Sequence, residues 1–147
     1  MSSLSGYKAY KTANVNTTDQ GKLILMTYDL AIKSCMQAVE CIGANDLSGK
    51  TKKLYKAQDC VTELRVALDH EKGGEIAANL EKLYEYFDWR ITQANIKNDT
   101  AMVTEVKNHL TELRKAWAEA IKKTRETGAA PEESTDNSDN NGLKMVG

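Results

Sequence analysis

The sequence has few side chains whose types and spacing could support metal binding or catalysis. Glu105 and His109 lie four residues apart, so a helix would place them on the same face. A di-iron helical bundle needs two Glu-x-x-His motifs and two further inward-facing glutamates, but the other histidine, His70, falls in a predicted turn. We therefore expect no metal site and no cofactor.

The possible nucleophiles are also isolated. Cys35, Cys41 and Cys60 lie in apolar helical stripes that neither histidine shares, whereas nucleophilic catalysis requires a base beside the thiol. Their odd number and the lack of a Cys-x-x-Cys pair indicate small core residues of a reduced, cytosolic protein. Helical bundles can also relay phosphate through one exposed histidine, and His109 is the candidate here, although no other residue supports that role. We expect no enzymatic activity.

Composition favours one helical domain with polar ends. The single proline, Pro131, lies outside the periodic part of the chain, so long helices are possible from residue 20 to residue 124. The net charge of −1 argues against general nucleic-acid binding. We see no basic region followed by an apolar core at the N-terminus, and we therefore expect no secretory signal.

Three segments follow from the distribution of apolar and charged residues. Residues 1–16 are predicted to form a flexible N-terminal arm, residues 17–125 a helical bundle, and residues 126–147 a disordered acidic tail. Apolar periodicity places four helices at about residues 20–42, 48–68, 75–96 and 100–124, with Asp99 capping the last of them. Because the connections are short, we predict an all-α fold, an antiparallel up-down four-helix bundle.

The first predicted helix has more apolar residues than one bundle face requires. Fourteen of the twenty residues at positions 23–42 are apolar, whereas a helix that covers one core needs only about 3/7. This surplus fits either a central helix with several neighbours or a surface kept for another protein. Asp29, Lys33 and Glu40 interrupt the stretch, so it does not read as a membrane span.

The arm carries three apolar anchors, Tyr7, Tyr10 and Val15, in a polar background. Such anchors suggest that the arm lies against something. It is either packed permanently on its own bundle or acts as a detachable cover over an apolar groove.

Several segments match the pattern of one protein family in order and spacing. They are the run KGGEIAANLEKLYEY at 72–86, Ala94-Asn95, Asp99, and ELRKAW at 112–117. At the front, Tyr7 and Tyr10 are followed by Val15-x-Thr17 and Leu23-x-x-Met26-x-Tyr28-Asp29-x-Ala31. With these residues the chain resembles the flagellar secretion chaperone family, FliS. It departs from the usual pattern at Leu30, where the family has glycine.

The resemblance implies a cytosolic chaperone that binds the disordered C-terminal segment of flagellin, prevents premature polymerisation and assists delivery to the flagellar type III secretion apparatus. It also suggests the export apparatus, an anti-sigma factor or a co-chaperone as further partners. The residues expected to contact flagellin are Tyr7, Tyr10, Val15, Leu23, Met26 and Tyr28. The alternative is a regulatory helical bundle that binds an anti-sigma factor or relays phosphate.

Overall fold

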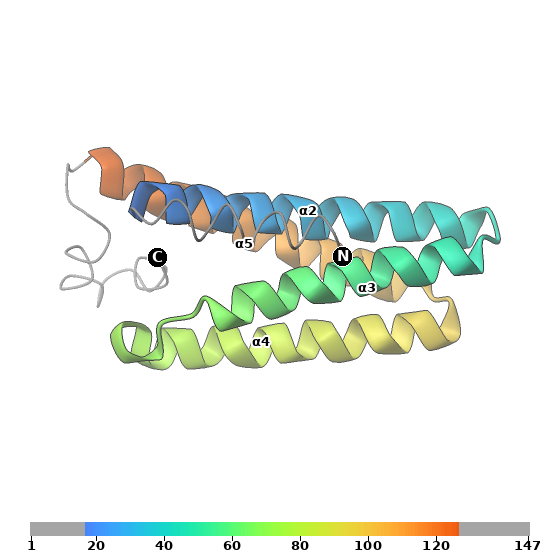
Figure 1. Ribbon diagram of the computed structural model, residues 1–147. Helices are drawn as coiled ribbons and strands as arrows, with labels where there is room; N and C mark the ends of the chain where they lie inside the picture. The colour runs from blue at the N-terminus through green and yellow to red at the C-terminus, as the bar shows by residue number, and fades with distance from the viewer. Residues whose placement is uncertain (1–16, 127–147) are drawn as a thin grey trace.

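The computed structural model describes residues 17–126, which form four antiparallel helices (Figure 1). They are α2 (Thr17–Gly43), α3 (Leu47–Val66), α4 (His70–Lys97) and α5 (Thr100–Glu126). Each of α2 and α4 packs against both α3 and α5, so α2 and α4 lie diagonally across the bundle. The predicted all-α antiparallel up-down four-helix bundle is confirmed. The predicted arm (1–16) and nearly all of the predicted tail (126–147) lie outside the described residues.

Aspartates begin three of the helices. The carboxylates of Asp46 and Asp69 accept hydrogen bonds from the backbone N–H groups of Gly49 and Lys72, each at 3.0 Å. Asp99 accepts one from Ala101 at 2.9 Å, which confirms the predicted cap. These bonds satisfy backbone donors that have no partner inside the first helical turn.

The turn predicted at residues 69–74 is shorter than expected. Because Asp69 caps a helical turn, α4 begins at His70, ahead of the glycine pair. The helix is then kinked at Gly74, whose φ of 50° and ψ of −125° are not helical. Glycine adopts this conformation readily because it has no Cβ.

The core is apolar along the whole bundle. Its largest fully buried side chains come from all four helices: Leu23, Tyr28, Leu54, Val61, Tyr84, Phe87, Ile91, Val103, Val106, Leu110 and Trp117. The aromatic members come from α2, α4 and α5 and gather between those three helices.

A buried lysine fastens one end of the bundle. Lys50, near the start of α3, is 5% exposed. Its Nζ donates to the backbone oxygen of Asn95 at 2.8 Å and to Oδ1 of Asn98 at 2.5 Å. Asn98 ends α4 in the left-handed conformation, with a φ of 53°. The contact therefore links the N-terminal end of α3 to the turn between α4 and α5.

Candidate protein-binding surface

Helix α2 presents apolar side chains around most of its circumference, as the sequence predicted. A core-facing row is fully or almost fully buried: Ile24, Tyr28, Ala31, Cys35 and Ala38. Beside it lie half-buried side chains that touch the core with one flank: Leu25, Leu30, Ile32 and Val39. Beyond these, Met26 is 50% exposed and Met36 is 51% exposed. A helix with one buried face needs only the first row.

The structure separates the six residues expected to contact a partner. Tyr7, Tyr10 and Val15 lie outside the described residues. Met26 is on the surface, whereas Leu23 is 1% exposed and Tyr28 is completely buried. Tyr28 lies on the core-facing row of α2, and its contact with a partner stays a prediction. Leu23 is covered in the same way, and its contact with a partner likewise stays a prediction.

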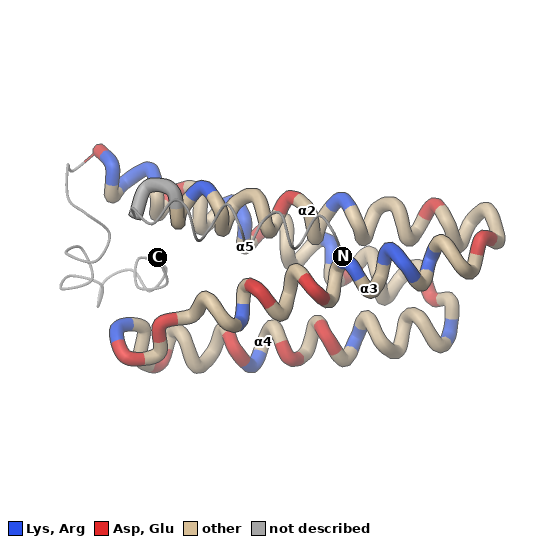
Figure 2. The backbone as a smooth tube through the Cα atoms, viewed as in Figure 1, with Lys and Arg blue, Asp and Glu red and all other residues tan. Residues whose placement is uncertain are grey.

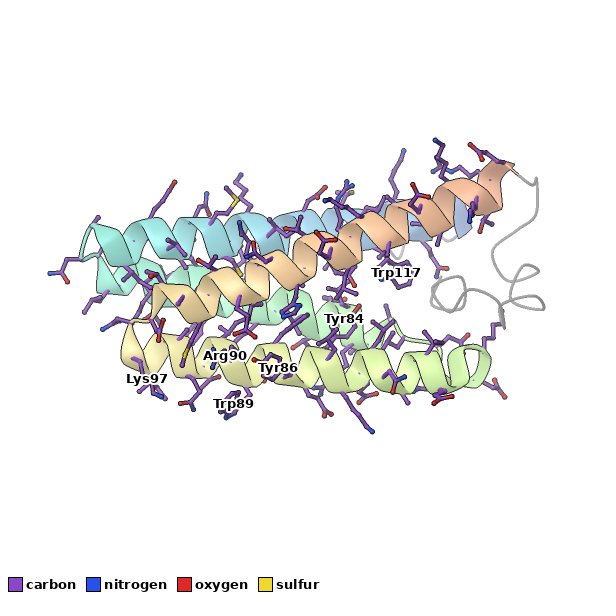
Figure 3. The ribbon with its side chains drawn as sticks, turned by 180° about the vertical axis from the view of Figure 1, so that it is seen from behind. Tyr84, Tyr86, Trp89, Arg90, Lys97 and Trp117 are labelled. Atoms are coloured by element: carbon purple, nitrogen blue, oxygen red, sulfur yellow. The ribbon has the colours of Figure 1, made fainter. Side chains whose placement is uncertain are left out.

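Tyr28 belongs to a buried aromatic cluster with Tyr84 and Trp117. The hydroxyl groups of Tyr28 and Tyr84 are 2.5 Å apart and share a hydrogen bond. Figure 3 shows Tyr84 of α4 and Trp117 of α5 in the space between their helices. These three side chains therefore connect α2, α4 and α5 through the centre of the bundle.

Burial keeps both tyrosines protonated. Loss of solvation raises the pKa of Tyr28 far above its usual value, and the neighbouring Tyr84 raises it further. Burial likewise raises the pKa of Tyr84 to about 12, while the Tyr28 hydroxyl and the Trp117 indole act in the opposite direction. Both hydroxyls therefore stay neutral at physiological pH and serve as hydrogen-bonding groups in the core.

A polar cluster joins the surfaces of α4 and α5 around Glu105. The carboxylate of Glu105 accepts hydrogen bonds from the Tyr86 hydroxyl at 2.6 Å and from Arg90 Nε at 2.7 Å. The Tyr86 hydrogen bond, helped by Arg90, lowers the pKa of Glu105. His109 stacks on Phe87, with ring centroids 5.8 Å apart, and its Nε2 lies 3.7 Å from Glu105. His109 is thus part of the α4–α5 contact, and no observation favours a phosphorelay.

Other large apolar side chains are exposed on α3 and α4. On α3 they are Leu47, Tyr55 and Val66, and on α4 they are Tyr86, Trp89 and Ile96. The sequence-based set of partner residues included neither Met36 nor Trp89. Trp89 carried a usable signal, because it lies off the core row of α4, in which Phe87 is followed by Ile91 at the next turn.

Within residues 17–126, no group of three or more His, Cys, Asp and Glu side chains is placed to hold a metal ion. The thiols of Cys35 and Cys60 are buried, and burial raises the pKa of each to about 12. They are therefore poor nucleophiles. None of the four described helices is long and apolar enough to cross a membrane. What the described surface offers is apolar contact area on a rigid bundle.

Comparison with known proteins identifies similar chains. The family model described as flagellar protein FliS matches residues 3–124. The flagellar secretion chaperone FliS of Bacillus subtilis (strain 168) is 39% identical over 119 residues, which are 81% of this chain and 88% of the relative. The protein of the same name from Salmonella typhimurium is 36% identical, over 80% of this chain and 90% of the relative. That of Escherichia coli (strain K12) is 32% identical, over 82% and 93%.

Proposed function

The chain belongs to the flagellar protein FliS family, and we propose that its client is the disordered C-terminal segment of flagellin, which it binds in the cytosol. Its relatives are named flagellar secretion chaperones, so a role as a chaperone for flagellar export follows from membership of the family. In our proposal the chaperone keeps flagellin from polymerising early and helps to deliver it to the type III secretion apparatus.

The apolar surplus of α2 is the observation that carries the proposal. Met26 and Met36 are half exposed on a helix whose core row is already complete. Methionine is flexible and polarisable, so it adapts to the irregular shape of a bound peptide. The half-buried residues Ile32 and Val39 lie on the same side of α2 as Met36, at spacings of four and three residues, and extend this apolar surface along the helix.

Energetics favour an extended surface for such a client. A disordered segment that orders on binding loses roughly 2–5 kcal/mol. At about 25 cal/mol per Å² of buried apolar area, offsetting 5 kcal/mol takes roughly 200 Å² before any net affinity appears. The 27 residues of α2 span about 40 Å at 1.5 Å per residue. A peptide lying along that length can bury this area without a deep pocket.

The proposal includes Tyr7, Tyr10 and Val15 of the N-terminal arm. Because these anchors precede α2 in the sequence, they can contribute to the same surface, either by contacting flagellin or by giving way to it. The export apparatus, an anti-sigma factor and a co-chaperone remain predicted partners from the family resemblance.

Calorimetric titration of a C-terminal flagellin peptide tests the proposal. We expect binding with a negative heat-capacity change, because apolar area is buried. Met26→Glu and Met36→Glu should each weaken binding by about tenfold or more, since a charge then enters an apolar contact. Val66→Glu is the matched control: Val66 is 70% exposed on α3, and its change should leave the affinity unaltered. No heat and no shift on gel filtration would remove flagellin as the client.

A further inference from the structure

The side of α5 that faces α2 is basic, with no acidic residue between Lys107 and Arg125. Its direction is fixed by Arg114, whose Nε lies 2.7 Å from Oδ1 of Asp29 on α2. Figure 2 shows basic residues gathered in the last turns of α5. Helical spacing places the following residues on this side, which we call the α5 stripe: Lys107, Thr111, Arg114, Ala118, Lys122 and Arg125.

The neighbouring side of α2 is apolar. Ile32, Met36 and Val39 follow Asp29 at intervals of three, four and three residues, so they share its side of the helix. Because Asp29 pairs with Arg114, this side lies next to the α5 stripe. Met36 is 51% exposed, and Ile32 and Val39 touch the core with one flank only. We call these three apolar residues together with the α5 stripe the α2/α5 face.

The charge of the α5 stripe is only partly neutralised within residues 17–126. Glu126 lies 4.0 Å from Lys122, at the limit of an ion pair. Lys107 has no ion pair with the side chains that the structure describes. It lies near Cys35 of α2: burial raises the pKa of this thiol, and the charge of Lys107 opposes that rise. A segment that fits the α2/α5 face therefore needs carboxylates as well as apolar side chains.

Residues 127–147 of this chain have that composition, and in a matching order. Acidic residues come first: Glu132, Glu133, Asp136 and Asp139. Apolar residues follow: Leu143, Met145 and Val146. The segment continues from Glu126, at the end of the α5 stripe. A chain that turns back from there brings its carboxylates to the stripe first and its apolar side chains further along, toward Met36 and Val39.

The segment is long enough to return along the bundle. Lys107 lies about 28 Å from Glu126 along α5, at 1.5 Å per residue. An extended chain advances about 3.3 Å per residue, so Asp139 can reach up to about 43 Å from Glu126. Because the segment is tethered to α5, its effective concentration at the α2/α5 face is of the order of millimolar, and weak contacts are enough to hold it there.

The outward side of α5 is unsuitable for this segment, because Glu112 and Glu119 lie on it and would repel the carboxylates. We propose that residues 127–147 fold back onto the α2/α5 face and cover its apolar residues until a client displaces them. The fold-back follows from charge and reach, whereas competition with the client rests on the proposed function. The affinity for flagellin is then reduced by the fraction of molecules whose face is covered.

Paramagnetic broadening in the full chain, without flagellin, tests the fold-back. A nitroxide is attached at Asn141→Cys in a Cys41→Ser background, because the other two cysteines are buried. The amide signals of Met36 and Lys107 should lose most of their intensity. The amide signal of Trp89 should keep its intensity, because α4 lies diagonally across the bundle from α2. Salt at 1 M should restore the lost signals, since it screens the ion pairs.

The variant Lys122→Glu should weaken the broadening, because it places a negative charge in the α5 stripe. Lys123→Glu is the matched control. Lys123 is also exposed, but it lies five helical turns beyond Glu105, on the side of α5 that faces α4. Equal broadening at Met36 and Trp89, or broadening that Lys122→Glu leaves unchanged, overturns the fold-back.

Calorimetry with the C-terminal flagellin peptide tests the competition. Truncation after Glu126 should strengthen binding by about threefold or more, since no fraction of the face stays covered. An unchanged affinity in the truncated chain overturns the competition even if the broadening is as expected. If the peptide does not bind either chain, the proposed client is wrong, and the broadening still decides whether residues 127–147 cover the face.

Discussion

The hydroxyl groups of Tyr28 on α2 and Tyr84 on α4 lie 2.5 Å apart and join the two helices that are diagonal in the bundle. Both side chains are almost completely buried, at 0% and 1% exposure. In an apolar core such a pair stabilises one register of α2 against α4. Any shift along either helix would leave two buried hydroxyls without partners.

Removing one of these hydroxyls should destabilise the bundle. Tyr28→Phe leaves the Tyr84 hydroxyl without this partner, so we expect the free energy of unfolding to fall by about 1–3 kcal/mol. The double variant Tyr28→Phe/Tyr84→Phe should lose less than the sum of the two single changes, since it removes both polar groups together. Urea unfolding measures these values, with the exposed Tyr55→Phe as control. Strictly additive losses would show that the two hydroxyls are not coupled.

Stability should fall steeply at alkaline pH. The pKa of Tyr84 rises from 10.0 to about 12 in the folded protein, and that of Tyr28 rises further. Above pH 10 the unfolded chain therefore releases protons that the folded chain retains, and each tyrosine lowers the free energy of unfolding by up to about 1.4 kcal/mol per pH unit. The contribution of the two protonated tyrosines to the free energy of unfolding is fully present below pH 10 and is lost as the pH rises toward 12. The double phenylalanine variant should show a shallower decline, and parallel curves would contradict this account.

The kink in α4 should depend on glycine for its backbone conformation alone. A Cβ at Gly74 would meet no atom within 4 Å, but the φ of 50° disfavours any other residue. We expect Gly74→Ala to lower the free energy of unfolding by about 1–2 kcal/mol. Gly43 also has open space and shows no positive φ, so Gly43→Ala should be neutral or stabilise by up to about 1 kcal/mol. Equal effects at the two sites, measured by urea unfolding, would show that strain at Gly74 is unimportant.

Deletion of residues 1–15 should separate the two interpretations of the arm. If Tyr7, Tyr10 and Val15 serve the client surface, flagellin affinity should change by about tenfold or more, while the melting temperature changes little. Calorimetry and thermal unfolding of the same preparation provide both values. A large drop in melting temperature with unchanged affinity would make the arm a permanent part of the bundle.

The helices were predictable because their signals are local. The seam of α3 at Leu54, Ala57, Val61 and Leu64 is buried as its spacing predicted. Asp99 caps α5 because the cap depends only on the next few residues. The start of α4 was missed, because the glycine pair gave a stronger turn signal than the cap at Asp69.

The candidate site was less predictable, because it depends on which apolar residues stay exposed once the helices have packed. Tyr28 matches the family pattern as well as Met26 does, yet one is buried and the other half exposed. The partner of Tyr28 is Tyr84, 56 residues away, and no periodicity in α2 specifies that distant contact. The spacing of Trp89 places it off the core row of α4, but its exposure also depends on which sides of α4 are covered by α3 and α5.

The two ends of the bundle differ in the contacts that must break before the helices separate. At one end the ammonium group of Lys50 is bonded to both Asn95 and Asn98. At the other end, Figure 1 shows the α2/α5 pair spread away from the α3/α4 pair. Local unfolding should therefore start at the spread end, where backbone amides would exchange with deuterium soonest, while the fastened end acts as a pivot.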